Sequence, residues 1–352
     1  CEAACPSGVP YSLLERGQEL AAGARPAAAV PGFVLRQLDD PGVLGVLESL
    51  ARIATRGARL LLGPRWRRLL DGTTFGRLLG TMPRAPRRDR ELVALLDERT
   101  GLTGPWRPPP AADRRDASLA FFRGCANRGL LPDTSRRLGS LCAAAGFALT
   151  DPPGQDCCGA LAAHTDRPGR AARLRGRNRE AFAAGDGPVP ILVEAAGCAL
   201  EMTGYGPDWA ARVTTPATLL ADADLPALAV VPLRVAVHDP CHARHGLGVV
   251  EAPRRLLRRI PGVEILEPEE AEVCCGSGGA WGLRHPDLAE ELGRRKARLL
   301  AATGADLVVT TNPGCLGQIA DGLALTAPEL PILPLTDLVW YAAARAGAGG
   351  GA

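Results

Sequence analysis

Eight of the 11 cysteines in the 352-residue sequence form two sets with nearly the same spacing. In each set an isolated cysteine is followed after 31 or 32 residues by an adjacent pair and a glycine, and after 39 more by a last cysteine. The first set is Cys125, Cys157, Cys158 and Cys198, and the second is Cys241, Cys274, Cys275 and Cys315. Four soft thiolates in each set predict a metal centre with sulfur ligands.

The spacing favours iron–sulfur clusters over other uses of cysteine. Structural zinc usually takes its ligands from two short C-x2–4-C knuckles, whereas these sets contain an adjacent pair. Such a pair can span two irons of a [4Fe-4S] cluster but binds a single metal with strain. A disulfide framework fits poorly, because neighbouring cysteines do not readily bridge each other. Structural zinc, and buried or redox-switching thiols, remain the alternatives.

A glycine follows each adjacent pair, Gly159 in the first set and Gly276 in the second. A residue without a Cβ lets backbone N–H groups approach cluster sulfides closely, so both glycines are candidate cofactor-binding residues. The alternative is that both simply allow a turn.

A third cysteine motif opens the chain. Cys1 and Cys5-Pro6 match the end of the ferredoxin run C-x2-C-x2-C-x3-C-P, in which the last cysteine serves the other cluster of a pair. Both are therefore predicted ligands of two different [4Fe-4S] clusters. Their remaining ligands would precede residue 1, so this ferredoxin-type site is incomplete here.

Four further residues have separate interpretations. His238, His242 and His245 surround Cys241, where a histidine would tune a cluster by hydrogen bonding or carry a proton. His238 is the best placed of the three, and ordinary surface or core histidines are the alternative. Cys142 has no counterpart in the second set and is predicted to be a small buried residue. No catalytic residue is assigned, because the sequence shows no substrate base and no flavin fingerprint.

The two sets belong to a tandem repeat with an offset of 116 or 117 residues. The sequence of each repeat predicts strands and helices in the order β-α-β-α-β. Expected strands include 119–122, 191–198, 235–238 and 307–315, and the expected helices are 135–145, 170–184, 252–260 and 287–303. This alternation predicts an α/β fold with two small, mainly parallel sheets. Each cysteine would then lie at the end of a strand or in the loop after it, where open α/β sheets collect ligands.

These patterns divide the chain into five parts. We expect the end of a ferredoxin-type domain at 1–23, a helical region with a Pro-rich linker at 24–117, the first cysteine-rich repeat at 118–232, the second at 233–345, and a flexible tail at 346–352. The Pro-rich run at 104–110 marks the stiff linker.

The composition excludes several classes of protein. A hydrophobic content of 46% with 22% charged residues excludes a disordered chain. The apolar runs are too short for a transmembrane helix. A net charge of +3 gives no sign of a nucleic-acid partner. Because there is no secretory signal and the first residue is not Met, we expect a cytoplasmic chain whose upstream part is absent. The arginine-rich stretch 65–68 is predicted to be a solvated helix face, with docking to a partner or to an anionic membrane surface, at the inner face of the cell membrane, as the alternatives.

The motif at 1–9, the two Cys-Cys-Gly repeats and the run Cys-Cys-Gly-Ser-Gly-Gly-Ala-Trp-Gly at 274–282 resemble the glycolate oxidase iron–sulfur subunit. That family lies within a wider group with heterodisulfide-reductase-type cysteine-rich (CCG) domains. The resemblance is weakest over 30–104. It implies two ferredoxin-type [4Fe-4S] motifs at the start of the complete subunit. It also implies an electron-transfer role next to flavin-bearing oxidase subunits, in which the chain passes electrons from glycolate oxidation to a quinone or another acceptor.

One departure from the wider family bears on the chemistry. Glu201 and Gln318 stand where the heterodisulfide-reductase form has a fifth cysteine. Four ligands favour a simple relay centre over an unusual cluster that reacts with disulfides. The iron–sulfur subunit of a lactate or anaerobic glycerol-3-phosphate dehydrogenase, and a zinc-stabilised interaction module without a redox role, are the alternative functions.

Overall fold

A computed structural model of the chain describes residues 46, 88–113, 117–164, 167–183, 189–279, 281–282 and 285–347. The predicted ligands Cys1 and Cys5, the arginine-rich stretch 65–68 and most of the region 24–117 lie outside these residues. The first complete element is helix α6 (Asp89–Thr100), and the Pro-rich stretch that follows it has no regular secondary structure. Among the described residues, no helix has the length and apolar character needed to cross a membrane.

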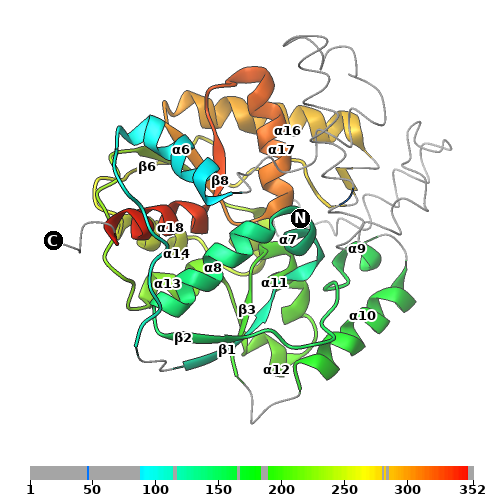
Figure 1. Ribbon diagram of the computed structural model, residues 1–352. Helices are drawn as coiled ribbons and strands as arrows, with labels where there is room; N and C mark the ends of the chain where they lie inside the picture. Colours follow the sequence, from blue (N-terminus) through cyan, green and yellow to red (C-terminus); the bar gives the residue numbers. More distant parts are fainter. Residues whose placement is uncertain are drawn as a thin grey trace.

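The first repeat forms a four-stranded sheet in the order β2-β1-β3-β4, and all neighbouring strands are parallel. Its strands are β1 (Ala117–Phe122), β2 (Phe147–Thr150), β3 (Ile191–Val193) and β4 (Val213–Thr214). The accompanying helices are α7 (Gly124–Leu130), α8 (Pro132–Ala144), α9 (Ala160–Ala163), α10 (Pro168–Ala181), α11 (Ala196–Thr203), α12 (Pro207–Ala210) and α13 (Pro216–Asp222). Figure 1 shows α10 and α12 on one side of this sheet and α8 and α13 on the other.

The second repeat has the same topology, with strand order β6-β5-β7-β8 and parallel neighbours throughout. Its strands are β5 (Arg234–His238), β6 (Glu264–Leu266), β7 (Leu307–Thr310) and β8 (Ile332–Pro334). Its helices are the π-helix η3 (His242–Gly246), α14 (Glu251–Arg258), α16 (Pro286–Ala302), α17 (Pro313–Thr326) and α18 (Leu335–Ala346). The predicted fold of two tandem α/β units with parallel sheets is therefore confirmed.

One strand of each sheet was not predicted, and two of the predicted strands were too long. Each sheet has a fourth strand that was not predicted, because β4 has two residues and β8 includes a proline, too little for a recognisable pattern. The expected strands 191–198 and 307–315 are too long. They end at Val193 and Thr310, and the Gly-Cys sequences that follow begin helices α11 and α17 instead.

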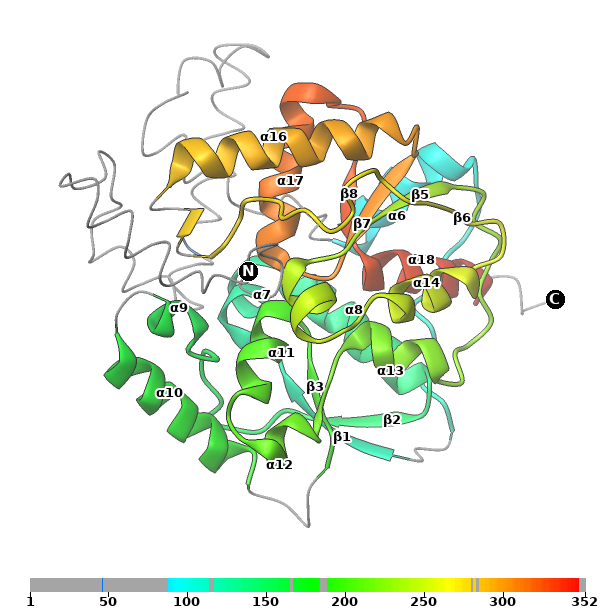
Figure 2. The same ribbon diagram turned by 180° about the vertical axis from the view of Figure 1, so that it is seen from behind.

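The two repeats share one hydrophobic core. Leu141 and Leu192 of the first repeat belong to the same buried cluster as Val235 and Trp340 of the second. Helix α18, red in Figure 1, packs against α8 of the first repeat, and both lie between the two sheets in Figure 2 as well. The repeats are therefore parts of one packed body, which fixes the position of one cysteine set relative to the other.

A buried ion pair lies at the centre of this contact. Arg137 Nη1 on α8 lies 2.9 Å from Asp337 Oδ2 on α18, and both side chains are completely buried. The Arg137 guanidinium also stacks over the Trp340 ring at 5.6 Å. Thr134 donates a further hydrogen bond to Asp337, at 3.1 Å. Because a buried charge without its partner is strongly destabilising, this pair favours one docking geometry of the two repeats.

Candidate metal centre

The four cysteines of the first repeat converge at one place. The Sγ atoms of Cys125 and Cys157 are 3.5 Å apart, and the thiol of Cys158 interacts with those of both Cys157 and Cys198. Cys125, Cys157 and Cys158 are buried, Cys198 is half-buried, and none of them forms a disulfide. The structure thus brings together every cysteine of the first predicted set.

The second set converges in the same way. The Cys274 thiol interacts with those of Cys241 and Cys275, and Cys275 interacts in turn with Cys315. These cysteines are also free thiols. The ligating atoms of Cys275, Cys315 and His238 lie within 4.8 Å of one another, and all three residues are buried. Each repeat therefore offers four neighbouring sulfurs to one metal centre, as the spacing predicted.

The single cysteines of each set lie in or next to helices rather than at strand ends. Cys125 is the second residue of α7, and Cys198 and Cys315 are the third residues of α11 and α17. Cys241 directly precedes η3. This corrects the expected placement of the single cysteines.

The two glycines after the adjacent pairs hold tight turns against the sulfurs. Gly159 has φ of 92° and Gly276 has φ of 85°, a region that side chains rarely adopt. The Gly159 N–H points at Cys157 Sγ over 3.5 Å, and the Gly276 N–H at Cys274 Sγ over 3.3 Å. A Cβ on Gly276 would meet the carbonyl oxygen of Ala289 at 2.5 Å. Turn geometry thus requires these glycines, and their contact with a cofactor stays a prediction.

Hydrogen bonds between the thiols of each set shift the pKa values of these thiols in opposite directions. The pKa of the Cys157 thiol lies well below its ordinary value, because Cys125, Cys158 and the Gly159 N–H donate hydrogen bonds to its sulfur. Cys274 has a lowered pKa for the same reasons, with Cys241 as its first donor. The donors Cys125 and Cys241 have raised pKa values, because they give hydrogen bonds and are buried. A metal that binds these sulfurs would displace their protons.

The other predicted residues fall into two groups. Cys142 is fully buried in α8, and its pKa is raised to about 12 by burial, which confirms the prediction of a small core residue. His242 Nδ1 lies 3.9 Å from Cys241 Sγ, whereas His245 Nε2 lies 3.2 Å from the Glu272 carbonyl oxygen. Only His238 and His242 are therefore close to the cysteine sulfurs.

The residues at the fifth-cysteine positions have structural roles. Glu201 forms an ion pair of 3.6 Å with Arg175, and Gln318 Nε2 donates to the Ala289 carbonyl over 2.6 Å. Neither residue supplies a sulfur. Four cysteines per centre is therefore the full sulfur set among the described residues.

One residue between the two centres was not predicted from the sequence. Asn312 Nδ2 lies 3.6 Å from Cys315 Sγ, and Asn312 Oδ1 accepts a hydrogen bond of 3.2 Å from the Gly197 N–H, next to Cys198. The asparagine precedes Pro313 at the N-cap of α17, and a polar residue at a helix start was the available signal. A single side chain thus links the two cysteine sets.

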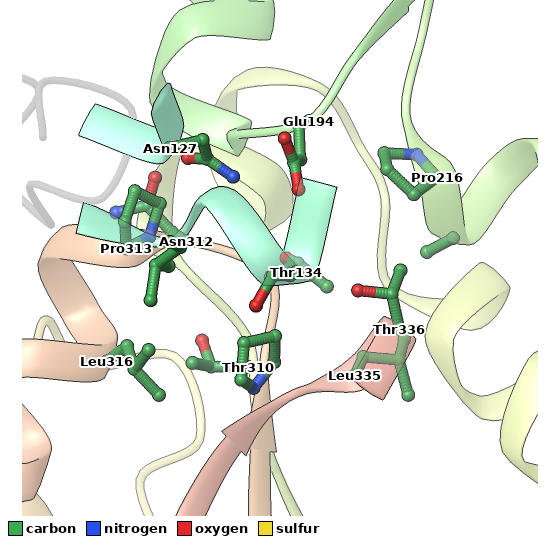
Figure 3. A pocket seen from close by; sticks show the side chains of 14 residues that line it. Asn127, Thr134, Glu194, Pro216, Thr310, Asn312, Pro313, Leu316, Leu335 and Thr336 are labelled. Carbon is green, nitrogen blue, oxygen red and sulfur yellow. The ribbon is translucent and has the colours of Figure 1, made fainter. Parts of the chain in front are cut away.

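A pocket opens beside this link, between the carboxyl ends of β3 and β7. Figure 3 shows Asn127, Glu194 and Asn312 around it, with Thr310 opposite. Glu194 is buried, which raises the pKa of its carboxyl to about 7 although Ser135 donates to it over 2.5 Å. A carboxyl with a raised pKa therefore lines the pocket beside Asn312. Sequence patterns do not single it out, because its burial arises only from the packing of the repeats.

Comparison with known proteins agrees with this architecture. The family model described as "CCG: Cysteine-rich domain" matches residues 119–203 and 235–320. One subunit of the fumarate reductase (CoM/CoB) of Methanothermobacter marburgensis is 35% identical over 58% of this chain and 42% of its own length. The probable glycolate oxidase iron-sulfur subunit of Bacillus subtilis is 29% identical over 92% of this chain and 75% of its own.

The glycolate oxidase iron-sulfur subunit of Escherichia coli is 28% identical over 91% of this chain and 75% of its own length. The chain thus spans less than half of the archaeal relative and three quarters of the two bacterial ones. Two sets of four clustered thiols also suit the iron–sulfur clusters that these names imply. The chain thus carries two cysteine-rich CCG domains, and glycolate oxidase iron–sulfur subunits are among its homologues.

Proposed function

We propose that this chain is the iron–sulfur electron-transfer subunit of a flavin-dependent 2-hydroxy-acid dehydrogenase, with glycolate as the substrate of the complex. The observation that carries the proposal is the convergence of four cysteine sulfurs in each repeat. When bound there, [4Fe-4S] clusters take up and release electrons one at a time.

The residues of the chain would hold and insulate these centres. Cys125, Cys157, Cys158 and Cys198 are the ligands of the first centre, and Cys241, Cys274, Cys275 and Cys315 those of the second. Burial of most of these sulfurs limits contact with water. The N–H groups of Gly159 and Gly276 stabilise negative charge on the sulfurs that they face.

The chain also connects the two centres. Helix α11, which carries Cys198, packs against η3, which follows Cys241, and α7 packs against α17. Asn312 completes the connection through its contacts with Cys315 and with the backbone next to Cys198. Two adjacent centres joined by one polar side chain are suited to a relay.

The electron balance assigns the remaining chemistry to partner subunits. Oxidation of a 2-hydroxy acid to a 2-oxo acid releases two electrons and two protons, which a flavin on a partner takes up. This chain would receive the electrons singly and pass them to a quinone, which becomes a quinol with two electrons and two protons. A quinone acceptor would bring the complex to the inner face of the cell membrane. With lactate or glycerol-3-phosphate as substrate, this chain would have the same role.

Metal and sulfide analysis of the anaerobically purified chain tests the proposal. If both repeats are loaded, each chain should contain about eight irons and eight acid-labile sulfides, with EPR signals that appear and disappear in one-electron steps. Colourless protein with two zinc ions and no iron would overturn the relay and support the zinc-stabilised interaction module instead.

A further inference from the structure

The two metal centres differ at one buried position. The last residue of β1 is Phe122, and the last residue of β5, 116 positions later, is His238. Phe122 has no exposed surface, and its ring and Cys198 Sγ both lie within 3.4 Å of the point where a Cβ on Gly124 would stand. His238 lies in the same way against Cys275 and Cys315. The same site in the fold thus presents a hydrocarbon ring to one centre and an imidazole to the other.

His238 is a buried polar side chain without a hydrogen-bond partner. Its exposed fraction is 2%, and neither Nδ1 nor Nε2 has a partner of hydrogen-bonding geometry among the described residues. Leaving a buried donor unsatisfied destabilises the folded chain. The imidazole lies within 4.8 Å of the two sulfurs. The unsatisfied group therefore faces the place where a metal centre would lie.

We propose that His238 donates a hydrogen bond to a sulfur of the second metal centre, which therefore has a higher reduction potential than the first. Four cysteines already supply one ligand to each iron of a [4Fe-4S] cluster, so a fifth donor is free to act on sulfur rather than on iron. Hydrogen bonds to cluster sulfurs are among the features that set the reduction potential. Phe122 has no group that can do the same at the first centre. The inference rests on the proposed function and deepens it.

Lys296, the single lysine of the sequence, adds positive charge at the same centre. It is 1% exposed, its Nζ donates to the Glu270 carbonyl over 2.5 Å, and its charge interacts with Cys275 and Cys274 as well as with the carboxylates of Glu272 and Glu270. The residue 117 positions earlier is Arg179, whose side chain is 45% exposed and pairs with Asp208. A buried cation is screened less by solvent than an exposed one, so the lysine charge acts on its neighbours more strongly than the arginine charge does.

The difference in reduction potential between the two centres gives the electron relay a direction. One electron leaves the first centre, which is oxidised, and enters the second, which is reduced, without a bond being made or broken. The first repeat is then the side that receives electrons from the flavin partner, and the second is the side that delivers them to the acceptor.

An EPR-monitored redox titration of the full chain, loaded with iron and sulfide under anaerobic conditions, tests this assignment. We expect two midpoint potentials in the wild type. In His238→Phe, which copies the residue of the first repeat, the higher potential should fall while the lower one and the iron content stay unchanged. His238→Gln keeps an N–H donor and should restore part of the shift.

Pulsed EPR on protein labelled with 15N-histidine supplies a second measurement. A weak nitrogen coupling at the high-potential centre should change with the label, and the contribution of His238 should disappear in His238→Phe while that of His242, next to Cys241, remains. An unchanged potential in His238→Phe, or a coupling as strong as that of a directly bound nitrogen, would overturn the hydrogen bond while leaving the relay intact. Absence of iron from the wild-type chain would overturn the relay itself.

Discussion

Asn312 and Gly197 join the two halves of the molecule beside the metal centres: the Gly197 N–H donates to Asn312 Oδ1 over 3.2 Å. Asn312 belongs to the second repeat and Gly197 to the first. Because Asn312 Nδ2 also approaches Cys315 Sγ at 3.6 Å, one side chain contacts one cysteine set and the backbone next to the other.

Replacing Asn312 should therefore disturb communication between the centres. In Asn312→Ala the Gly197 N–H loses its acceptor, and we expect the free energy of unfolding to fall by about 1 kcal/mol. Electron transfer between the centres should slow, with unchanged iron content, when followed by freeze-quench EPR after rapid photoreduction.

Asn312→Asp is the matched control for that experiment. It keeps an oxygen that accepts from Gly197 but removes the donor to Cys315. If electron transfer proceeds at the wild-type rate in both variants, the side chain is only a structural contact.

Serine substitution of the second cysteine in each pair should remove one centre at a time. Cys158 and Cys275 each interact with two other thiols of their set, so their loss breaks the sulfur cluster. We expect Cys158→Ser and Cys275→Ser each to retain about half of the wild-type iron, measured with acid-labile sulfide.

Cys142→Ala is the control for the cysteine variants. This buried thiol lies in the hydrophobic core rather than in a cysteine set, so the variant should lose stability and keep its iron. Wild-type iron content in both serine variants, or iron loss in Cys142→Ala, would contradict the ligand assignment.

The glycines after the cysteine pairs should tolerate alanine to different degrees. Both have positive φ, which costs an alanine about 1–2 kcal/mol. A new Cβ would stand 2.5 Å from the Ala289 carbonyl oxygen at Gly276 but 3.3 Å from the Ala171 carbonyl oxygen at Gly159. We therefore expect Gly276→Ala to destabilise the chain more than Gly159→Ala in urea unfolding. If Gly159→Ala destabilised the chain more than Gly276→Ala, the closer contact at Gly276 would not decide the cost of the substitution.

Glu194 should make stability depend on pH. Burial raises the pKa of its carboxyl from 4.5 to about 7, so between these values the folded chain binds a proton that the unfolded chain releases. The free energy of unfolding should therefore fall by about 3 kcal/mol as pH rises through this window, and stay low above it.

Glu194→Gln removes the titrating group and keeps the size of the side chain. The difference in stability between wild type and variant, from urea unfolding at several pH values, should change across the window with the sign given above. If the difference in stability between wild type and variant does not change as the pH goes from the ordinary to the raised pKa of the carboxyl, Glu194 titrates normally.

The repeats, the parallel sheets and the grouping of the cysteines could be predicted, because each depends on patterns that are local or recur at a fixed offset. Cys125, Cys157, Cys158 and Cys198 meet because strand ends and helix starts share one edge of a parallel sheet. The two-residue strand β4 was not predictable, since pairing with β3 rather than its own sequence defines it.

The contacts between the repeats could not be predicted for a different reason. Asn312 and Glu194 acquire their roles from neighbours that are far away in the sequence or in the other repeat, whereas His238 is singled out from the sequence by its position before Cys241. Contacts between such distant residues leave no periodic pattern in the sequence. The ferredoxin-type motif of Cys1 and Cys5 lies outside the described residues and stays a prediction.

The central claim is that each repeat binds an iron–sulfur cluster through its four cysteines. The most direct measurement is an anomalous difference map, recorded at the iron absorption edge from anaerobically grown crystals of the loaded chain. We expect two iron peaks, one among Cys125, Cys157, Cys158 and Cys198, and one among Cys241, Cys274, Cys275 and Cys315. A map without iron at these sulfurs, or with a zinc-edge signal in their place, would contradict it.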